Sequence, residues 1–484
     1  RCRVRACRCC VLSGAARRRF SARDTTTVLA KTLARMAPSR VIVLTGPTAV
    51  GKSALGLRLC EALPGELISV DSVQVYRGLQ IGANKPSASE LARVPHHLVD
   101  ICEPRDDYTA GAFYRDALKA VKQVLERGKT PVLVGGTSMY LKWLVNGRPD
   151  APRSDPAIAK RAHAMLQDYE KAGDWNSALS RLAEYDSHRA KELFANDWYR
   201  LHRALVVALQ TQEGSTNQEE PVEPEVLQLD ELRASLDMRC FFLTFPREQL
   251  CRRIDSRCEQ MVQAGLIEEV AELLATERLL PSSPAGRAIG YRQTIDYLLR
   301  EPFVPDDKGA LQHFVEGFAA ASRQYAAKQT KWFRKEPLFR WVETTSIGTA
   351  ETTLMQATRI GRAEFEEELR STSQISLRRV TRDEQKAMRC YMRIDGLLCD
   401  GARWRALLAR ADACAARLQP LREALEAADA VERARYPFHA LGKRRARDGS
   451  GGEDEDEDGG GCDGGGSGRG GGGGGGGGVG GDIA

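Results

Sequence analysis

Long apolar runs are absent from this chain of 484 residues. The longest candidates, such as Val41–Leu44 and Val132–Val134, have only the length of a β-strand and are soon followed by glycine. A helix that crosses a bilayer needs about 20 predominantly apolar residues. We therefore predict that the protein does not enter a membrane.

Cysteine is present but lacks the spacing of a disulfide framework or of a metal site. Four of the 13 cysteines lie within the first ten residues, and the others are scattered without a paired CxxC in the body of the chain. Cys390, Cys399 and Cys414 do not have the spacing of a zinc finger, and His439 stands alone. This pattern predicts reduced, intracellular thiols and no zinc site.

A strong net charge is also lacking once the chain is divided. Residues 1–40 hold eleven Arg or Lys and one acid, whereas residues 448–484 hold nine acids and one base, which leaves the body between them at +4. So weak a charge does not by itself indicate a protein that binds nucleic acid. An RNA-binding function would have to rest on local basic clusters.

The first segment is rich in arginine and nearly free of acids. These features of residues 1–39 are typical of a transit peptide, which predicts a plastid or a mitochondrion as the location of the protein. The alternative is that translation starts at Met36 and that the protein is cytoplasmic.

A phosphate-binding loop stands out directly after the first apolar run. Its glycines allow backbone N–H groups to surround phosphate oxygens at the start of a helix, Lys52 supplies a positive charge, and the Ser53 hydroxyl can bind Mg²⁺. An apolar strand that ends in aspartate, which would hold Mg²⁺ in an ordinary ATPase, is missing, because Val132–Val134 leads into glycine. The residues that match GxxxxGK[ST] are Gly46, Pro47, Thr48, Ala49, Val50, Gly51, Lys52 and Ser53.

Short strands and helices alternate around this loop, which predicts a parallel α/β sheet. Expected strands are 41–45, 66–70, 130–134 and 238–245, and expected helices are 54–63 and 110–127. Residues 154–212 are charged and helical in pattern, 212–230 is acidic and predicted to be a loop, and 404–428 predicts an amphipathic helix.

The domains that we expect follow from this pattern. They are a P-loop α/β core at 40–150 and 236–345, an all-helical insertion at 151–235, a C-terminal helical region of unknown role at 346–447, and a disordered acidic and glycine-rich tail at 448–484.

Five further stretches, in order with the P-loop, resemble the tRNA dimethylallyltransferase (IPP transferase) family of bacterial or organellar type. The resemblance covers about residues 40–340. Each stretch alone is weakly specific, whereas the ordered set is highly specific. The stretches are Asp71–Arg77, Gly82–Pro86, Pro95–Asp100, Gly135–Tyr140 and Arg287–Gln293.

The resemblance implies a channel through the core, which dimethylallyl diphosphate and a flipped adenine of tRNA enter from opposite mouths. It implies that Asp71 binds the adenine N6 amine and acts as general base, a role that suits a carboxylate because the nitrogen becomes acidic as its new bond forms. Thr48, Lys52 and the loop amides would hold the diphosphate, with Mg²⁺ on Ser53. Arg257 would contact the diphosphate, and Thr137 would lie at the channel wall.

Further residues match positions that contact RNA in the family. Arg200 and Arg203 lie three apart on one face of an expected helix, within a stretch that resembles the tRNA-facing helix. The others, from Asp71–Gln74, Arg287–Gln293 and Lys328–Lys335, are Asp71, Ser72, Val73, Gln74, Arg287, Tyr291, Arg292, Lys328, Lys331 and Arg334. Two departures from the family pattern are Ala327, where a second base is common, and Ala83, where threonine is common.

Each assignment has an alternative that the sequence leaves open. Asp71 could merely cap the next segment, Arg257 could be solvated on a charged helix, and Tyr291 could belong to the core. Arg200 and Arg203 could form a solvated basic face. His96 and His97 have no spaced partners and are interpreted as structural residues.

Three other functions remain to be separated from tRNA prenylation. An adenylate isopentenyltransferase would share the P-loop and the base but prenylate free AMP, ADP or ATP. A small-molecule kinase would use ATP and need no prenyl donor. A non-catalytic RNA-binding module would need neither Asp71 nor Lys52. The insertion and the basic stretches favour tRNA, and we expect a monomer.

Overall fold

The computed structural model describes residues 39–148, 155–213, 224–371, 374, 391–393, 396 and 400–427. The expected transit peptide, except for its last residue, and the expected disordered tail lie outside these residues. None of the helices in the described parts is both long enough and apolar enough to cross a membrane.

A six-stranded parallel sheet forms the centre of the molecule, in the order β3-β2-β4-β1-β5-β6. This confirms the predicted α/β class. The strands are β1 (Arg40–Thr45), β2 (Gly65–Val70), β3 (His96–His97), β4 (Thr130–Gly135), β5 (Asp237–Thr244) and β6 (Arg340–Glu343).

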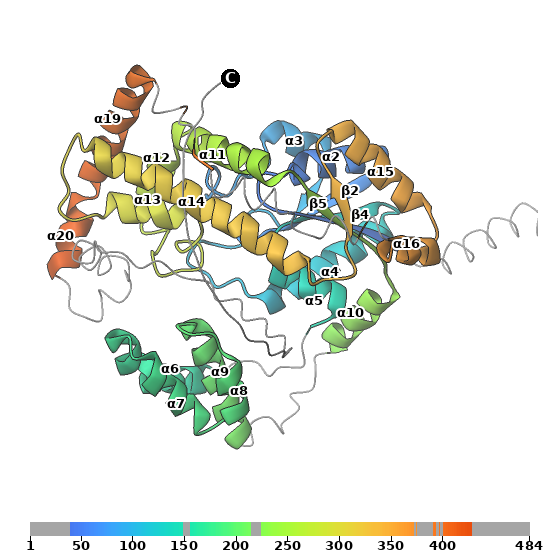
Figure 1. Cartoon of the computed structure of the whole chain (residues 1–484), viewed down its shortest axis with the longest axis horizontal. Coiled ribbons are helices and arrows are strands. Elements are labelled where there is room, and N and C mark those ends of the chain that lie inside the picture. The colour runs from blue at the N-terminus through green and yellow to red at the C-terminus, as the bar shows by residue number, and fades with distance from the viewer. Residues whose placement is uncertain are drawn as a thin grey trace, which may run out of the picture.

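Alternate residues of the central strands belong to two different hydrophobic clusters, one on each face of the sheet. On β1, Ile42 and Leu44 belong to one cluster, and Val41 and Val43 belong to the other. Such continuous apolar strands are expected in a parallel sheet covered on both sides. Helices cover both faces (Figure 1).

The helices of the core come from sequence segments on both sides of the insertion. Those before it are α2 (Lys52–Ala62), α3 (Ala88–Arg93), α4 (Ala110–Glu126) and α5 (Ser138–Asn146). Those after it are α10 (Pro224–Ser235), α11 (Arg247–Gln263), α12 (Leu266–Ala275), α13 (Tyr291–Leu298), α14 (Lys308–Phe333), α15 (Ile347–Arg359) and α16 (Arg362–Leu369). The long helix α14 runs beside α11 and α12 (Figure 1).

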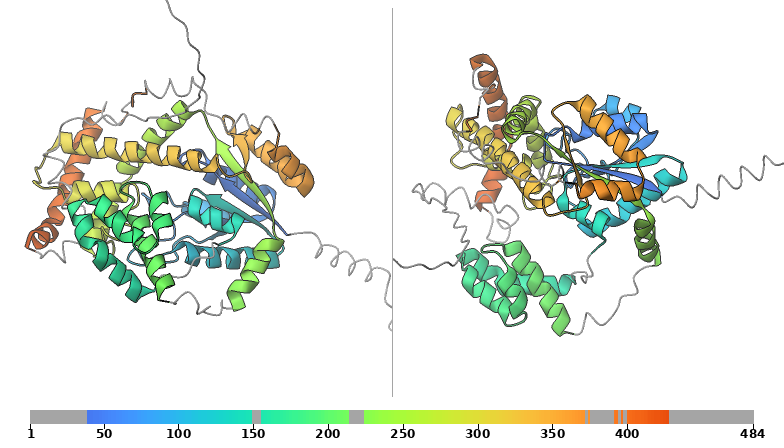
Figure 2. Two further views of the ribbon diagram at one scale, coloured as in Figure 1. Left: turned by 60° about the horizontal axis from the view of Figure 1, so that its bottom comes forward. Right: turned by 45° about the vertical axis from the view of Figure 1, so that its right-hand side comes forward.

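The insertion contains α6 (Pro156–Ala172), α7 (Trp175–Ala183), α8 (Ser187–Glu192) and α9 (Trp198–Gln212). Its buried residues, among them Trp175, Leu201 and Leu205, form a third hydrophobic cluster of their own. The lobe stands at the bottom of Figure 1 and is displayed from two other sides in Figure 2.

One expected loop is wrong in part. Within the predicted loop 212–230, the residues from Pro224 onward form α10 instead. Leu229 is buried in the cluster that also contains residues of α4, and the Tyr114 hydroxyl donates to Asp230 at 2.5 Å. Contacts with a distant helix therefore stabilise a segment whose acidic, proline-containing sequence suggested a loop.

The C-terminal region, to which the sequence assigned no role, folds back onto the core. The amphipathic helix expected at 404–428 corresponds to α19 (Gly401–Arg417) and α20 (Gln419–Ala427). Helix α19 packs on α12, where Arg417 pairs with Glu272 at 2.7 Å and Arg410 with Glu268 at 3.2 Å. These pairs join residues about 145 positions apart.

Candidate active site

The P-loop leaves β1 and leads into α2, so its amides lie at the carboxyl end of the central strand. Gly46 has φ of 154°, and a Cβ there would lie 2.7 Å from the Leu243 carbonyl oxygen, so only glycine fits. Lys52 Nζ donates to the carbonyl oxygens of Gly46 and Pro47, each at 2.9 Å. The ammonium group therefore lies against the backbone of the loop.

Two positive charges meet at this loop. Desolvation by burial, assisted by the nearby Arg257, lowers the pKa of Lys52 to about 7, and Asp71 opposes this shift. The Lys52 side chain is still partly exposed, but its Nζ is the end that turns inward. Burial also lowers the pKa of Arg257. Burial therefore disfavours the charged forms of both side chains, and an anion bound between them would offset that cost.

Arg257 reaches the loop from α11. Its Nη2 donates to the Thr48 hydroxyl, which brings these two predicted residues together. Its Nε is buried and has no hydrogen-bond partner within the described chain. An unpaired buried donor is costly, and a diphosphate oxygen would satisfy it. The alternative that Arg257 is merely solvated on its helix does not fit this geometry.

Asp71 directly follows the last residue of β2, the strand that pairs with β4 in the sheet. Its Oδ1 accepts from the amides of Val73 and Gln74 at 2.8 and 3.3 Å. The carboxylate does cap the following turn, as the alternative held, but with one oxygen only. Within the described chain, Oδ2 has no hydrogen-bond partner. The capped oxygen fixes the orientation of the carboxylate and leaves the other oxygen able to accept a hydrogen bond.

Thr137 lies at the end of β4 and contacts the residue after Asp71. Its hydroxyl accepts from the Ser72 amide at 3.1 Å and lies 3.4 Å from the Ser72 hydroxyl. Strands β2, β4 and β1 are neighbours, so Asp71, Thr137 and the P-loop share one edge of the sheet. In open parallel sheets, ligands bind outside this carboxyl edge.

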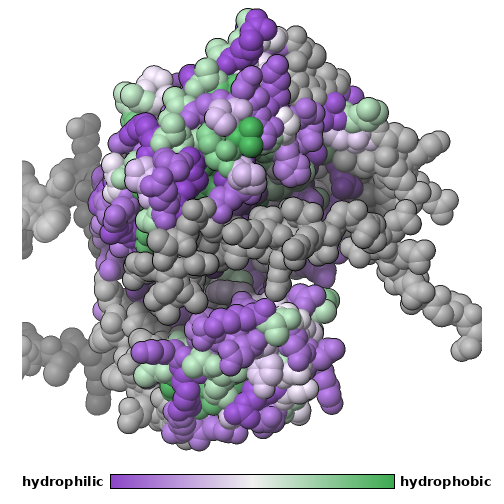
Figure 3. Space-filling model, turned by 90° about the vertical axis from the view of Figure 1, so that its left-hand side faces the viewer, coloured by the Kyte–Doolittle hydropathy of each residue, from purple (hydrophilic) through white to green (hydrophobic). Residues whose placement is uncertain are grey.

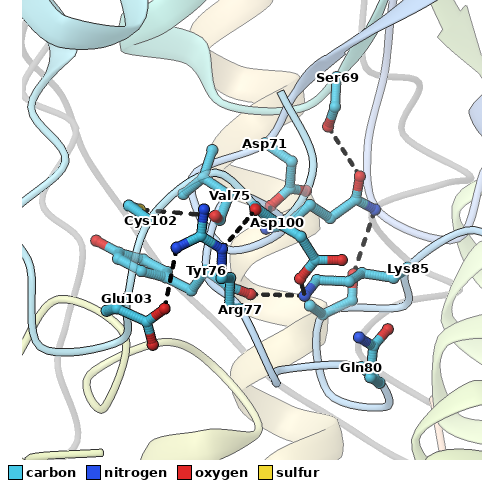
Figure 4. A network of polar contacts seen from close by, with 12 residues as sticks. Ser69, Asp71, Val75, Tyr76, Arg77, Gln80, Lys85, Asp100, Cys102 and Glu103 are labelled. Atoms are coloured by element: carbon cyan, nitrogen blue, oxygen red, sulfur yellow. Dashed lines mark hydrogen bonds and ion pairs between the residues drawn. The ribbon is translucent and has the colours of Figure 1, made fainter. Parts of the chain in front are cut away.

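A buried lysine anchors the segment that carries Asp71, and sequence reasoning missed it. Lys85 Nζ donates to the Tyr76 carbonyl oxygen at 2.6 Å and to the Asp100 carboxylate, with a side chain only 2% exposed (Figure 4). The Gln74 amide donates to the carbonyl oxygens of Ala83 and Asn84. Both Lys85 and Asp100 stood in the stretches that carry the resemblance, and this was the available signal.

The predicted RNA contact of Tyr291 is wrong. Its ring is completely buried and packs so closely on Gly82 that a Cβ there would lie 2.6 Å from it. Its hydroxyl donates to Glu269 at 2.7 Å, and Glu269 in turn accepts from the amides of Gln80 and Ile81. The tyrosine therefore holds the 80–82 loop against α12 and offers no face to a base.

The other predicted RNA residues differ in exposure. Arg287 and Arg292 are exposed beside Tyr291, and Arg292 lies 3.9 Å from Asp296. Lys328 and Lys331 are exposed on α14, whereas Arg334, which follows the helix, is half-buried. Val73 is half-buried, and the Gln74 side chain is engaged within the protein as described above.

On the insertion, Arg200 is exposed on α9 and pairs with Asp197 at 3.1 Å, and Arg203 is half-buried one turn later. Two large aromatic residues near Arg200 are strongly exposed: Phe194 at 76% and Tyr199 at 80%. Exposed aromatic and basic residues together suit the recognition of unstacked RNA bases. The sequence analysis did not single out these aromatics, although Tyr199 directly precedes Arg200.

Possible metal ligands occur at two places in the described residues. Ser53 is exposed at the start of α2 beside the P-loop amides, and a hydroxyl oxygen is a ligand type that Mg²⁺ accepts. His163, Glu170 and His202 gather on the insertion, where His202 and Glu170 form a pair at 3.0 Å. His96 and His97 lie at neither place, because they form β3 and bind the Val94 carbonyl oxygen and Glu66.

The family model described as IPP transferase matches residues 74–336. The chain belongs to the IPP transferase family. Its match to tRNA dimethylallyltransferase 9 of Arabidopsis thaliana is 39% identical over 328 residues and covers 63% of this chain and 71% of the relative. A tRNA dimethylallyltransferase of Protochlamydia amoebophila is 37% identical over 306 residues, covering 63% of this chain and 84% of the relative.

A solved structure supports membership of the IPP transferase family. It is a eukaryotic dimethylallyltransferase acting on tRNA, with a TM-score of 0.51 and 26% identity. The match covers 66% of this chain and 77% of that one. The family that the motifs suggested is therefore confirmed.

Proposed function

We propose that this chain transfers a dimethylallyl group from dimethylallyl diphosphate to the N6 amine of adenine 37, the base 3′ to the anticodon in tRNA. The observation that carries the proposal is the arrangement at one sheet edge. There the P-loop residues Lys52 and Thr48, together with Arg257 from α11, lie near Asp71. In the described chain, Asp71 Oδ2 has no hydrogen-bond partner. The relatives named as tRNA dimethylallyltransferases support the same activity.

The cationic residues at the P-loop and the carboxylate of Asp71 have separate parts in the reaction. The adenine N6 forms a bond to C1 of the donor while the bond between C1 and the diphosphate oxygen breaks. Lys52, Arg257 and the loop amides stabilise the charge that develops on the leaving diphosphate. The proton lost by N6 goes to Asp71, whose carboxylate is fixed through Oδ1 by the Val73 and Gln74 amides.

The Ser53 hydroxyl, exposed at the start of α2, would be the protein ligand of Mg²⁺. When bound, the ion would neutralise part of the diphosphate charge. Thr137 would shape the wall between the cationic residues and Asp71 through its contact with Ser72.

Prenylation of free AMP, ADP or ATP is the second candidate. The insertion favours tRNA over a free nucleotide, because it is a lobe with a core of its own that displays Arg200, Phe194 and Tyr199. A free nucleotide would not need such a surface. We further propose that the enzyme acts as a monomer, in a plastid or mitochondrion if residues 1–39 are a transit peptide and in the cytoplasm if translation starts at Met36.

The test is a competition between acceptors. The protein is incubated with labelled dimethylallyl diphosphate, Mg²⁺ and unmodified tRNA, together with equal concentrations of AMP and ATP. The label should appear in tRNA at adenine 37 and hardly at all in the free nucleotides. Comparable labelling of AMP would establish the second candidate instead, and transfer of phosphate from ATP would indicate a kinase.

A further inference from the structure

One buried glutamine connects the two halves of the site. Gln329, on α14, is only 4% exposed. Its Oε1 accepts from the Thr48 amide of the P-loop at 2.9 Å, and its Nε2 donates to the Gly136 carbonyl oxygen, after β4, also at 2.9 Å. A single side chain therefore joins the loop that would hold the diphosphate to the strand end that leads to Thr137.

The chemistry of the two contacts requires a primary amide. One partner is a donor and the other an acceptor, and a side-chain amide supplies both without charge. The approach is so close that a Cβ at residue 136 would lie 2.3 Å from Gln329 Nε2, so glycine is needed there. The contact therefore depends both on the amide of Gln329 and on the absence of a side chain at residue 136.

Thr48 is held from two helices at once. Gln329 on α14 takes its backbone N–H, and Arg257 on α11 donates to its hydroxyl. The two helices are tied to each other by Cys258 and Ser322 at 3.5 Å and by the ion pair of Arg323 with Asp255. The Thr48 amide is therefore engaged within the protein and not directed at the diphosphate.

We propose that Gln329 is a positioning residue, which sets the distance between the diphosphate cradle and the wall that carries Asp71 and Thr137. This inference rests on the proposed function. Lys328 and Lys331, which we expect to contact RNA, belong to the same helix. RNA that contacts these lysines would therefore bind to the same helix that holds Thr48 of the P-loop through Gln329.

The first test compares two leucine variants of the full chain. Gln329→Leu removes both hydrogen bonds at nearly constant volume, and Gln324→Leu makes the same change at an exposed position of α14. In a single turnover with saturating tRNA and donor, Gln329→Leu should slow transfer about 10–100-fold, since a misplacement of about 1 Å costs that much. Its tRNA affinity should stay within about twofold of the unmodified protein, and Gln324→Leu should behave as the unmodified protein in both assays.

A glutamate variant separates positioning from a general loss of packing. When ionised, at alkaline pH, Gln329→Glu presents an anion to the Gly136 carbonyl oxygen and should be at least as slow as the leucine variant. When protonated, its carboxyl group can again donate to Gly136 and accept from Thr48, and burial favours this neutral form. The rate relative to unmodified protein at the same pH should therefore rise as pH falls for the glutamate variant and stay flat for the leucine variant.

Hydrogen exchange gives a result that does not depend on activity. The Thr48 amide should be protected in the unmodified protein and in Gln324→Leu, and should exchange faster in Gln329→Leu. Unchanged exchange at Thr48, or a Gln329→Leu protein with a normal single-turnover rate, would overturn the proposal. So would tighter binding of pyrophosphate by Gln329→Leu, because Gln329 would then compete with the ligand for the amide. If the unmodified protein prenylates no tRNA, the proposed function fails, and exchange at Thr48 still decides whether Gln329 holds the loop.

Discussion

The α/β core and the helical insertion use their charged residues in different ways. In the core, Lys52 and Arg257 converge on one loop, and burial lowers the pKa of both. In the insertion, several basic residues are exposed and pair with acids one turn away, as Arg189 does with Glu192 and Arg200 with Asp197. Hydrophilic residues cover most of the visible face of this lower lobe (Figure 3).

This difference indicates a division of work. Buried, convergent charges are preorganised for a ligand and lose much when displaced slightly. Surface charges in water contribute little individually, but each phosphate contact releases counterions from RNA. We therefore expect changes in the core to alter chemistry while binding persists, and changes in the insertion to alter tRNA binding while donor binding persists.

The largest effect is expected from Asp71→Asn. The side-chain oxygen of the variant can still accept hydrogen bonds from the Val73 and Gln74 amides, so the local turn should be kept. It cannot receive the N6 proton, and turnover should fall about 10²–10⁴-fold, the usual contribution of a general base. Turnover is measured with labelled donor, and donor and tRNA affinities are measured by calorimetry and filter binding. Normal turnover would remove Asp71 from the mechanism, and lost donor binding would indicate a structural defect.

The second prediction concerns the separate core of the insertion. Trp175 is buried there and packs edge-on against Trp198, with the two ring centroids 5.2 Å apart. Trp175→Ala should cost about 3–5 kcal/mol of stability, as is usual for a large buried aromatic residue. Because the cluster is separate, the insertion should lose protection in hydrogen exchange and bind tRNA poorly, whereas the donor should bind normally.

Trp341→Ala provides the matched control for that variant, because Trp341 is 2% exposed in a cluster of the sheet. It should impair donor binding and leave hydrogen exchange in the insertion unchanged. If Trp175→Ala abolishes donor binding as well, the two regions do not fold independently and the comparison fails.

The P-loop and Asp71 could be predicted from the sequence because each depends on local information. The loop is a fixed pattern between a strand and a helix, and Asp71 directly follows a strand. The parallel sheet followed from alternating elements. The sequence left open whether Tyr291 belongs to the core, since its burial depends on Gly82 and Glu269 in distant segments.

Other features depend on the same kind of long-range contact. The bridge made by Gln329 joins residues 281 and 193 positions away. Strand β6 is only four residues long and acquires its role by pairing with β5. A single sequence contains no local signal for such pairings, and this is why β6, α10 and the docking of α19 were missed.

The third prediction uses the lowered pKa of Lys52. Burial lowers this pKa to about 7, so the ligand-free protein loses the charge as pH rises through that value. A bound diphosphate favours the charged form and raises the pKa. Donor affinity should therefore be level below pH 7 and fall by up to about tenfold per pH unit above it, with uptake of a proton on binding.

Calorimetry at pH 8 in two buffers of different ionisation enthalpy measures that proton. Lys52→Met protein is the control, and its weaker affinity should lack this proton uptake. Equal binding enthalpies in both buffers with the unmodified protein would mean that Lys52 is already charged before the donor binds.

The smallest effect is expected on the insertion surface, where Arg200 and Arg203 lie on one face of α9. If both contact phosphates of the anticodon stem, replacing both with Ala should make the plot of log tRNA affinity against log salt shallower by about one to two units. Donor affinity should not change, because the cradle of Lys52 and Arg257 lies in the core. Arg362→Ala with Arg370→Ala removes the same charge from exposed positions around α16 and should leave the slope unaltered. An unaltered slope in the Arg200 and Arg203 variant would mean that these charges face only water, and that the RNA contacts of this chain lie along Lys328 and Lys331 on α14. The core would then bind tRNA as well as catalyse, and the division of work between the two regions would no longer hold.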